Sequence, residues 1–283
     1  MIRRPTLALL LTAFVAACGG GATPAPSTAS SVAPSTAPVA TNAVGTELTI
    51  YAASSLKGAL DKVKTAYEAA NPGVTLIIST DSSSALETKI EQGAPADVFL
   101  SADTTNPKKL FDGGFASSSP VVFAGNTLVI IVPKGNPAGV LAPFDLAKSG
   151  LKVIAAGDTV PITKYATKLV QNIGALPGAP AGFEGAYAAN VVSKEENVKA
   201  VVTKIELGEG DAAIVYVTDA AASGKVDSVA ITPDTANVPA TYAGVVVKAS
   251  SNQAAAAMFL AWFAGADGQA ILKSFGFLAP PAA

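Results

Sequence analysis

Two serine-containing turns in the sequence could hold a negatively charged ligand. Ser54 and Ser55 follow the apolar run 48–51, and Ser82–Ser84 follow the apolar run 74–79. Each turn precedes a helical pattern, and the start of a helix leaves backbone N–H groups without partners and is partly positive. Hydroxyls and such N–H groups can replace the water shell of an anion without a basic side chain. Taken singly, each turn is more typical of simple helix capping by serine.

Two further helix starts and one tyrosine extend this pattern. Ile162 follows a Val-Pro pair at the start of a helical pattern, and Val198 opens another after Ser193–Glu196, whose spacing predicts a capping box. Tyr216 ends the apolar strand 213–217 and could equally be a core tyrosine with a local hydrogen-bond partner. A fully deprotonated tetrahedral oxyanion presents only acceptors, so a site made of donors suits it. A protonated anion would need an acceptor as well.

The composition narrows the possible chemistry. Half of the 283 residues are apolar, 14% are charged, and the formal net charge is -2. This allows a sizeable core and gives no electrostatic footprint for nucleic acid. The chain has no histidine, which excludes histidine acid–base catalysis and histidine nucleophile pairs. A hydrolase with paired carboxylates stays an alternative, although no nucleophile–base pattern accompanies its candidates, Asp81, Asp97, Asp103 and Asp158.

The N-terminus has the pattern of an export signal. Arg3 and Arg4 precede the apolar stretch 7–15, which is too short to span a bilayer. The stretch ends at Val-Ala-Ala-Cys18, which resembles the lipobox of bacterial lipoproteins, and Cys18 is the only cysteine. We expect a lipoprotein signal peptide over 1–17 and a lipid on Cys18; the alternative is an ordinary signal peptide that contains a cysteine. Residues 18–46 are rich in Pro, Ala, Ser and Thr, which predicts a disordered tether.

From residue 47 onward, strand and helix patterns alternate. This alternation predicts an α/β fold with largely parallel sheets, in which ligands bind near the carboxyl ends of strands. The uninterrupted apolar runs 127–132 and 242–248 are candidate connections between two lobes. We therefore expect lobe 1 to comprise 47–126 and 244–283, and lobe 2 to comprise 127–243. Ser84 and Glu87 have capping-box spacing, and Gly93 and Gly208 suit helix ends.

Seven short stretches, taken in order, match a known family. They are Ala52–Leu56, Ser82–Ser84, Gly93–Asp103, Gly125–Val129, Gly157–Asp158, Val160–Pro161 with Tyr165, and Ala213–Tyr216 with Asp219–Ala220. Together they resemble the periplasmic molybdate-binding proteins of ABC importers. The Gly-Ala-Pro-Ala-Asp stretch at 93–97 is specific to this group of binding proteins, and the resemblance extends from residue 47 to the C-terminus.

The resemblance implies a fold and a site. The fold is the type II periplasmic-binding-protein fold, with two α/β lobes, two crossing strands and a cleft between the lobes. The oxyanion is held by neutral donors, with no basic side chain, no metal and no cofactor. Carried over to this chain, the oxyanion-binding residues are Ser55, Ser83, Ile162, Val198 and Tyr216, of which Ile162 and Val198 act through their backbone N–H groups.

Two residues depart from the family pattern or complicate it. Thr163 stands where family members often have glycine, in a loop from Gly157 to Pro161 that is shortened. Asp81 precedes the serine-rich turn, and a like charge there would oppose anion binding. We therefore expect Asp81 to point away from the site or to be hydrogen-bonded.

The function implied is that of a binding protein, not an enzyme. It would capture molybdate, and tungstate with it, for the membrane subunits of an ABC importer. We expect a monomer, exported and anchored by lipid to the outer face of the cytoplasmic membrane. The alternatives are a binding protein for another oxyanion such as sulfate or phosphate, the carboxylate hydrolase, and the ligand-sensing domain of a regulator. The export signal and the absence of a DNA-binding segment argue against the last of these.

Overall fold

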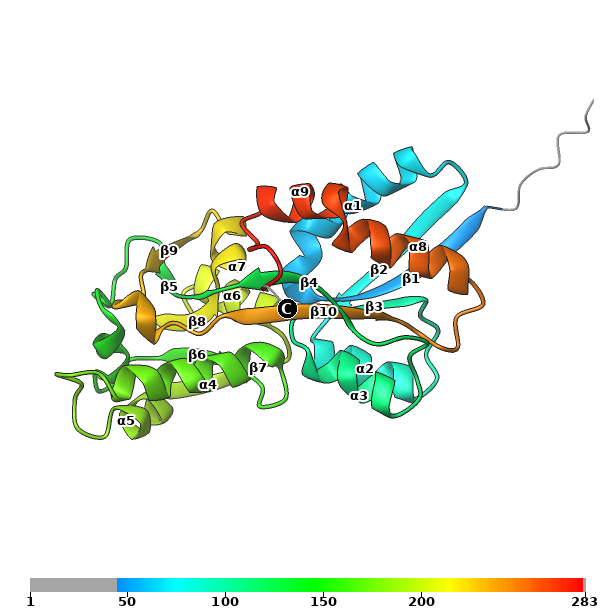
Figure 1. Cartoon of the computed structure of the whole chain (residues 1–283). Coiled ribbons are helices and arrows are strands. Elements are labelled where there is room, and N and C mark those ends of the chain that lie inside the picture. The colour runs from blue at the N-terminus through cyan, green and yellow to red at the C-terminus, as the bar shows by residue number, and fades with distance from the viewer. Residues whose placement is uncertain (1–44, 282–283) are drawn as a thin grey trace, which may run out of the picture. The chain divides into compact units, whose positions relative to one another are not determined.

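The computed structural model describes residues 45–281. The predicted signal peptide 1–17, Cys18 and all but the last two residues of the predicted tether 18–46 lie outside these residues. Ala43–Ala283 groups into one compact unit. Its strands form two five-stranded sheets with helices on both faces of each sheet (Figure 1).

The first sheet combines parallel and antiparallel strands. Its strand order is β2-β1-β3-β10-β4. Strand β1 pairs in parallel with β2 and β3, whereas β10 is antiparallel to both β3 and β4. The strands are β1 (Thr46–Ala53), β2 (Val74–Asp81), β3 (Val98–Ser101), β4 (Val121–Asn126) and β10 (Ala240–Val246).

The second sheet repeats this mixture. Its strand order is β7-β6-β8-β5-β9. Here β6 pairs in parallel with β7 and β8, and β5 is antiparallel to β8 and β9. The strands are β5 (Leu128–Pro133), β6 (Val153–Ala156), β7 (Val191–Glu195), β8 (Ala212–Tyr216) and β9 (Val226–Val229).

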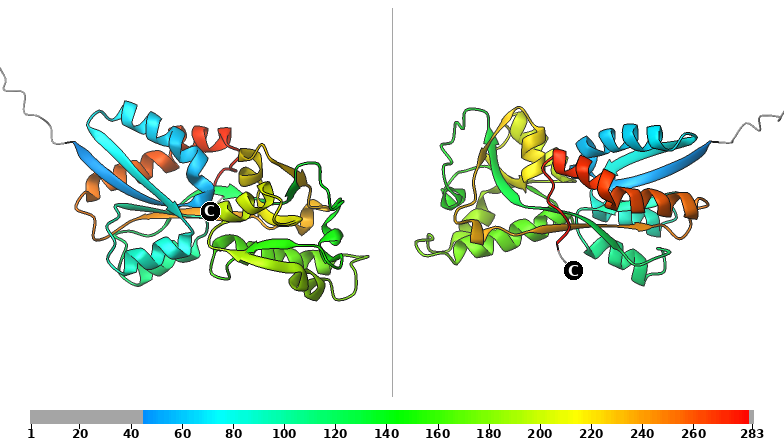
Figure 2. Two further views of the ribbon diagram at one scale, coloured as in Figure 1. Left: turned by 180° about the vertical axis from the view of Figure 1, so that it is seen from behind. Right: turned by 45° about the horizontal axis from the view of Figure 1, so that its top comes forward.

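Helices cover both faces of each sheet. On the first sheet, α1 (Lys57–Ala70), α8 (Gln253–Ala264) and α9 (Ala266–Ser274) lie on one face and α2 (Ser83–Glu91) and α3 (Thr105–Asp112) on the other (Figures 1 and 2). On the second sheet, α4 (Pro161–Gly174) and α5 (Phe183–Asn190) lie opposite α6 (Val198–Glu206) and α7 (Val217–Ala222). Short 3-10 turns complete the chain: η1 (Ser54–Leu56), η2 (Pro143–Ala147) and η3 (Asp234–Ala236).

We call each sheet with its helices a lobe. The chain passes from the first lobe to the second between β4 and β5, and it returns between β9 and β10. The first expected division, after residue 126, falls between β4 and β5. The second was expected after residue 243, but β10 already pairs with β4 of the first sheet from Ala240 onward. The limits of the lobes along the chain stay a prediction.

The α/β architecture predicted from the alternating patterns is confirmed, but the sheets are less parallel than expected. In each sheet two of the four strand pairings are antiparallel, and all of these involve the strands next to the crossings. The sequence analysis did not predict β4, α3, α5 or α7. Among residues 45–281, no single helix is long and apolar enough to cross a membrane. Helices α8 and α9 taken together have the required length and apolar composition, but the pair is bent by 54°.

Both predicted capping boxes are wrong, and neighbouring residues cap the helices instead. Ser82, not Ser84, is the N-cap of α2, and its Oγ accepts from the N–H of Ala85 at 3.2 Å. The segment around Ser193 is strand β7, and Asn197 caps α6 by accepting from the N–H of Ala200 at 3.0 Å. The glycine stops are confirmed, since Gly93 and Gly208 follow their helices with φ of +87° and +72°.

Candidate functional site

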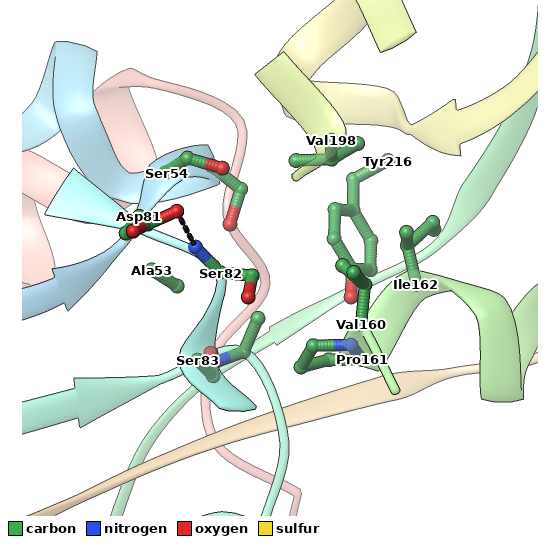
Figure 3. Close-up of a pocket in the computed structure, with 12 residues that line it drawn as sticks. Ala53, Ser54, Asp81, Ser82, Ser83, Val160, Pro161, Ile162, Val198 and Tyr216 are labelled. Atoms are coloured by element: carbon green, nitrogen blue, oxygen red, sulfur yellow. Dashed lines mark hydrogen bonds between the residues drawn. The ribbon is translucent and has the colours of Figure 1, made fainter. Parts of the chain in front are cut away.

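A small cavity lies where the two lobes meet. Its cavity volume is about 10 Å³, which is enough to hold at least one water molecule. Residues of the first lobe and of the second lobe face each other across it (Figure 3). The five residues that the resemblance singled out all line it, together with seven others: Ala53, Ser54, Ser55, Asp81, Ser82, Ser83, Ala102, Val160, Pro161, Ile162, Val198 and Tyr216.

On the first lobe, the two candidate serines are buried and each has one hydrogen-bond partner within that lobe. Ser55 lies in η1, directly after β1, and its Oγ is 3.0 Å from the Tyr242 hydroxyl. Ser83 begins α2, and its Oγ accepts from the N–H of Ala102 at 3.0 Å. Because that bond uses Ser83 as the acceptor, its own proton is available to another group. Ser83 can therefore donate into the pocket.

On the second lobe, two helix starts present backbone N–H groups. Ile162 is the second residue of α4, and Val198 is the first residue of α6. N–H groups at these positions have no acceptor within their own helix. Thr163 does not enter the pocket, because its hydroxyl donates to the carbonyls of Ala156 and Gly157 at 3.1 and 2.8 Å. The threonine at position 163 thus leaves the pocket open, and Ile162 still lines it.

Tyr216 closes the second-lobe side with a hydroxyl that has no partner. The side chain is 1% exposed. Its hydroxyl is one of two buried side-chain polar atoms without a hydrogen-bond partner among residues 45–281. Burial is the main cause that raises the pKa of Tyr216 well above its ordinary value, and the nearby Tyr242 is the second cause. The hydroxyl is therefore a neutral donor. A buried polar atom without a partner is uncommon, and a ligand at this position would supply the missing acceptor.

Asp81 lines the same pocket, and it is hydrogen-bonded as expected. Its carboxylate accepts from the Ser82 N–H at 2.8 Å, from Asn197 at 3.4 Å and from the Lys89 ammonium at 3.0 Å. Burial raises the pKa of Asp81, but these donors outweigh burial and hold the pKa below its ordinary value. The negative charge is therefore neutralised locally by Lys89 instead of being left facing an anion. Asn197 belongs to the second lobe, so this contact also joins the lobes.

The other aspartates considered for hydrolysis do not converge on the cavity. Asp97 accepts from Thr49 N–H and from Ser250 and lines a different hollow. Asp103 is bonded to Ser101 and Asn106 at the start of α3. Asp158 is exposed and forms an ion pair with Lys194. None of these three carboxylates lines the pocket that holds the serines, so no carboxylate pair forms there.

The sequence analysis missed polar groups that lie behind the pocket wall. Asn126 and Tyr242 are buried and are hydrogen-bonded to each other. Asn126 also bonds to Thr218, and Tyr242 also bonds to Ser55. Asp219, in α7, is buried as well, and one of its oxygens has no partner. Burial raises the pKa of Asp219 to about 7, against a lowering influence from Lys199. The sequence signal that could have revealed this network was the occurrence of a polar asparagine and a tyrosine, Asn126 and Tyr242, within or beside apolar strand patterns.

Two α/β lobes with a small, donor-lined pocket between them define a binding protein that encloses a small anionic solute. Comparison with known families agrees with this class. The chain belongs to the family of bacterial extracellular solute-binding proteins, whose family model matches residues 48–278.

Individual relatives and structures narrow the similarity. The chain is 33% identical to the molybdate-binding protein ModA of Mycobacterium tuberculosis over 272 residues, which cover 96% of this chain and 95% of the relative. It resembles a solved substrate-binding domain from Clostridium difficile, described as that of a molybdenum ABC transporter, with 29% identity and a TM-score of 0.61 over 83% of this chain and 99% of that one. The periplasmic molybdate-binding protein of Azotobacter vinelandii has the same fold, with 24% identity and a TM-score of 0.67 over 82% of this chain and 99% of that one.

Two other matches concern the alternatives. The sulfate-binding protein SubI of Mycobacterium tuberculosis shares the fold, with a TM-score of 0.73 at 21% identity, covering 82% of this chain and 86% of that one. An aconitate isomerase from a Pseudomonas species is 25% identical over 242 residues, which cover 84% of this chain and 89% of the relative. The fold thus occurs with several solutes, and the site has to carry the functional argument.

Proposed function

We propose that the protein captures molybdate, and tungstate with it, outside the cytoplasm and delivers it to the membrane subunits of an ABC importer. The observation that carries this proposal is the set of donors around one cavity. Ser55, Ser83 and Tyr216 supply hydroxyls, and Ile162 and Val198 supply backbone N–H groups. Relatives with names that specify molybdate binding cover nearly the whole chain.

The chemistry of the pocket suits a fully deprotonated tetrahedral oxyanion. Burying an ion without compensation carries an idealised desolvation cost of order 20 kcal/mol. Donors fixed by helix starts and by buried partners replace the water shell without reorganising. The only charged residue in the lining is Asp81, which is already paired with Lys89. An anion that carries a proton would need a free acceptor, which disfavours phosphate at neutral pH.

We propose a binding role without turnover. Of the candidate carboxylates only Asp81 lines the pocket, and the lining holds no nucleophile–base pair. Because one relative is named an aconitate isomerase, the absence of turnover needs to be measured. Incubation of the protein with candidate oxyanions and organic acids should leave every compound unchanged, and conversion of any of them would overturn the binding-only role.

The deciding experiment is calorimetry of the purified protein against molybdate, tungstate, sulfate and phosphate at one pH and salt concentration. We expect saturable binding of molybdate and tungstate at one site per chain, weaker binding of sulfate and none of phosphate. Tighter binding of sulfate than of molybdate would reassign the solute to the main alternative. Absence of binding to all four anions would contradict the proposal.

We also propose that the protein is anchored by a lipid on Cys18 and acts as a monomer. The lipid anchor is supported by the Val-Ala-Ala-Cys pattern after a short apolar stretch. Cys18→Ala should move the protein from the membrane fraction to the soluble exported fraction and abolish labelling by a fatty-acid analogue. Labelling that persists in this variant would contradict lipidation of Cys18.

A further inference from the structure

We propose that Tyr242 and Asn126 are positioning residues that force the Ser55 hydroxyl to donate its proton into the pocket. The inference rests on the proposed oxyanion-binding function and names residues of that site that do not touch the solute. Its basis is the direction of each hydrogen bond in a buried chain of side chains behind η1. Neither residue lines the pocket.

The chain of contacts is short and almost completely buried. Tyr242 is 0% exposed and Asn126 is 1% exposed. The Asn126 amide nitrogen lies 3.4 Å from the Tyr242 hydroxyl and donates to the Thr218 hydroxyl at 2.9 Å. The Tyr242 hydroxyl in turn lies 3.0 Å from Ser55 Oγ. In burial this deep, each polar atom depends on these partners alone.

The orientation of the Asn126 amide is set by the backbone. Its Oδ1 accepts from the Thr127 N–H at 3.0 Å, which places the NH₂ group toward Tyr242 and Thr218. An amide NH₂ is a donor only. The Tyr242 oxygen must therefore accept from Asn126, and it is left with its own proton to give.

The proton of Tyr242 goes to Ser55, the other polar group in reach. Burial is the main cause that raises the pKa of Tyr242 well above its ordinary value, and the charge of the nearby Asp219 is the second cause. The phenol therefore keeps its proton. A phenol is also a stronger donor than an aliphatic hydroxyl. Ser55 Oγ therefore accepts on its buried side, and its own proton is directed to the cavity that it lines.

Ser83 reaches the same state by a simpler route. Its Oγ accepts from the Ala102 backbone N–H, a group that can only donate. The two serines thus behave alike toward a ligand, but one is fixed by the backbone and the other by a tyrosine and an asparagine. The orientation of Ser55 can be changed by substitutions outside the pocket, whereas that of Ser83 cannot.

The network also connects Ser55 to the strands at both crossings. Asn126 ends β4, directly before the chain enters the second lobe, and Tyr242 lies near the start of β10, directly after the chain returns. Thr218 belongs to α7 of the second lobe. The donor direction of Ser55 therefore depends on side chains from both lobes being in their places.

The test is Tyr242→Phe, which removes the hydroxyl and keeps a ring that packs against Phe277 and Tyr216 at centroid distances of 5.5 and 5.6 Å. We expect molybdate affinity measured by calorimetry to fall roughly two- to tenfold, the range for one hydrogen bond between neutral groups. Tyr67→Phe is the control for loss of a phenol hydroxyl away from the pocket, because Tyr67 is 2% exposed and packs on Phe259 in the first lobe. It should leave the affinity unchanged.

A double-mutant cycle distinguishes positioning from a general loss of structure. In a Ser55→Ala background, Tyr242→Phe should change the affinity by less than about 1.5-fold, because the hydroxyl that it orients is gone. Asn126→Ala should behave in the same way with a smaller loss, and it serves as the second variant if Tyr242→Phe does not fold. An undiminished effect of either variant in the Ser55→Ala background would overturn the proposal.

The outcomes separate this inference from the proposed function. Wild-type protein that binds none of the four oxyanions would refute the function, and the inference with it. Wild-type binding with a Tyr242→Phe affinity equal to that of the wild type would refute the positioning role and leave the function in place. A loss of the same size in Tyr67→Phe would attribute the effect to removal of any tyrosine hydroxyl from the first lobe.

Discussion

The two lobes treat their buried polar groups differently. In the first lobe, Asp97 and Asp103 are fully engaged by backbone and side-chain donors, and the candidate serines each have an inner partner. In the second lobe, the Tyr216 hydroxyl and Asp219 Oδ2 have no partner, and these two atoms are the complete set of such buried side-chain atoms among residues 45–281. The polar groups without partners are therefore all on one side of the cleft.

This difference indicates how the work of binding is divided. The first lobe is pre-organised, because its hydroxyls are already held in donor directions before a ligand arrives. The second lobe carries groups whose burial without a partner costs about 1–3 kcal/mol each in other proteins. An anion at the cavity would give Tyr216 its acceptor. The ligand should thus stabilise the second lobe more than the first.

The largest expected effect concerns Asp219 and pH. Its folded-state pKa of about 7 lies above about 3.9 for an unfolded aspartate, so the folded protein binds this proton more tightly than the unfolded chain does. The free energy of unfolding should therefore fall as pH rises from about 4 to about 7, by at most about 4 kcal/mol. Urea unfolding of wild type and Asp219→Asn at pH 5 and pH 8 checks this.

The Asn variant should gain stability relative to wild type at pH 8 and less, or none, at pH 5. A wild-type-minus-variant difference that is the same at both pH values would mean that Asp219 does not titrate in this range. Asp97→Asn is the contrasting variant, because Asp97 is held by several donors. Its substitution should lower stability at both pH values.

The pre-organised serines should give the next largest effect, on affinity. Ser55→Ala and Ser83→Ala each remove a hydroxyl donor to a charged acceptor, which contributes about 1.5–3 kcal/mol, so each should weaken molybdate binding roughly ten- to a hundredfold. Lys57→Ala and Lys164→Ala are the controls. Lys57 is exposed and Lys164 donates to Thr105 across the cleft mouth, and both should have much smaller effects.

Titration of all four variants at low and high salt provides the measurement. Binding by neutral dipoles should vary little with ionic strength, whereas binding by surface lysines would be screened. If the lysine variants lose more affinity than the serine variants, the solute binds at a charge-paired site elsewhere. The first lobe would then not supply the donors assigned to it.

The second lobe offers a test that acts on the backbone alone. Val198 is the first residue of α6, a position where proline fits, and Asn197 before it has the extended φ and ψ of −155° and 168° that proline requires of its predecessor. Val198→Pro removes the N–H and should weaken binding about tenfold or more. Val198→Ala keeps the N–H and should bind nearly as wild type. Equal affinity of the two variants in calorimetry would exclude this N–H as a donor.

The loss of affinity expected at Tyr216 comes with a gain in stability. Tyr216→Phe removes a hydroxyl that has no partner in the ligand-free pocket, so the free protein should melt at a higher temperature. The same change should weaken molybdate binding about tenfold, because the donor is lost. Thermal melts with and without molybdate measure both. A lower melting temperature of the free variant would show that the hydroxyl already has a partner.

Much of this site could be predicted from the sequence, because its residues lie where strands turn into helices. The turns at Ser55, Ser83 and Ile162 are visible as small or Val-Pro residues between apolar and helical patterns. Ser55 and Ser83 lie close because they follow β1 and β2, which are parallel neighbours in one sheet. Ile162 follows β6 of the other sheet, and only the family resemblance indicated that it joins the serines. That these residues bind the solute stays a prediction until titration.

The capping residues and the inner network could not be predicted in the same way. Ser82 and Ser84 are two residues apart, and serine at either position could cap α2. The sequence alone could not show which of them does so. The contact between Asn126 and Tyr242 joins residues 116 positions apart, and no local pattern marks such a pair. Helix α5 was missed because its sequence contains one glycine and three alanines among eight residues and has little amphipathic periodicity.

The position of the pocket between the two lobes has a consequence for the rates of exchange. A solute held by residues of both lobes can enter or leave only when the lobes separate, so both association and dissociation must wait for that motion. The residence time of the solute would then equal the lifetime of the closed arrangement, whatever the strength of the individual donors. Any partner that separates the lobes would set the release rate without contacting Ser55 or Tyr216.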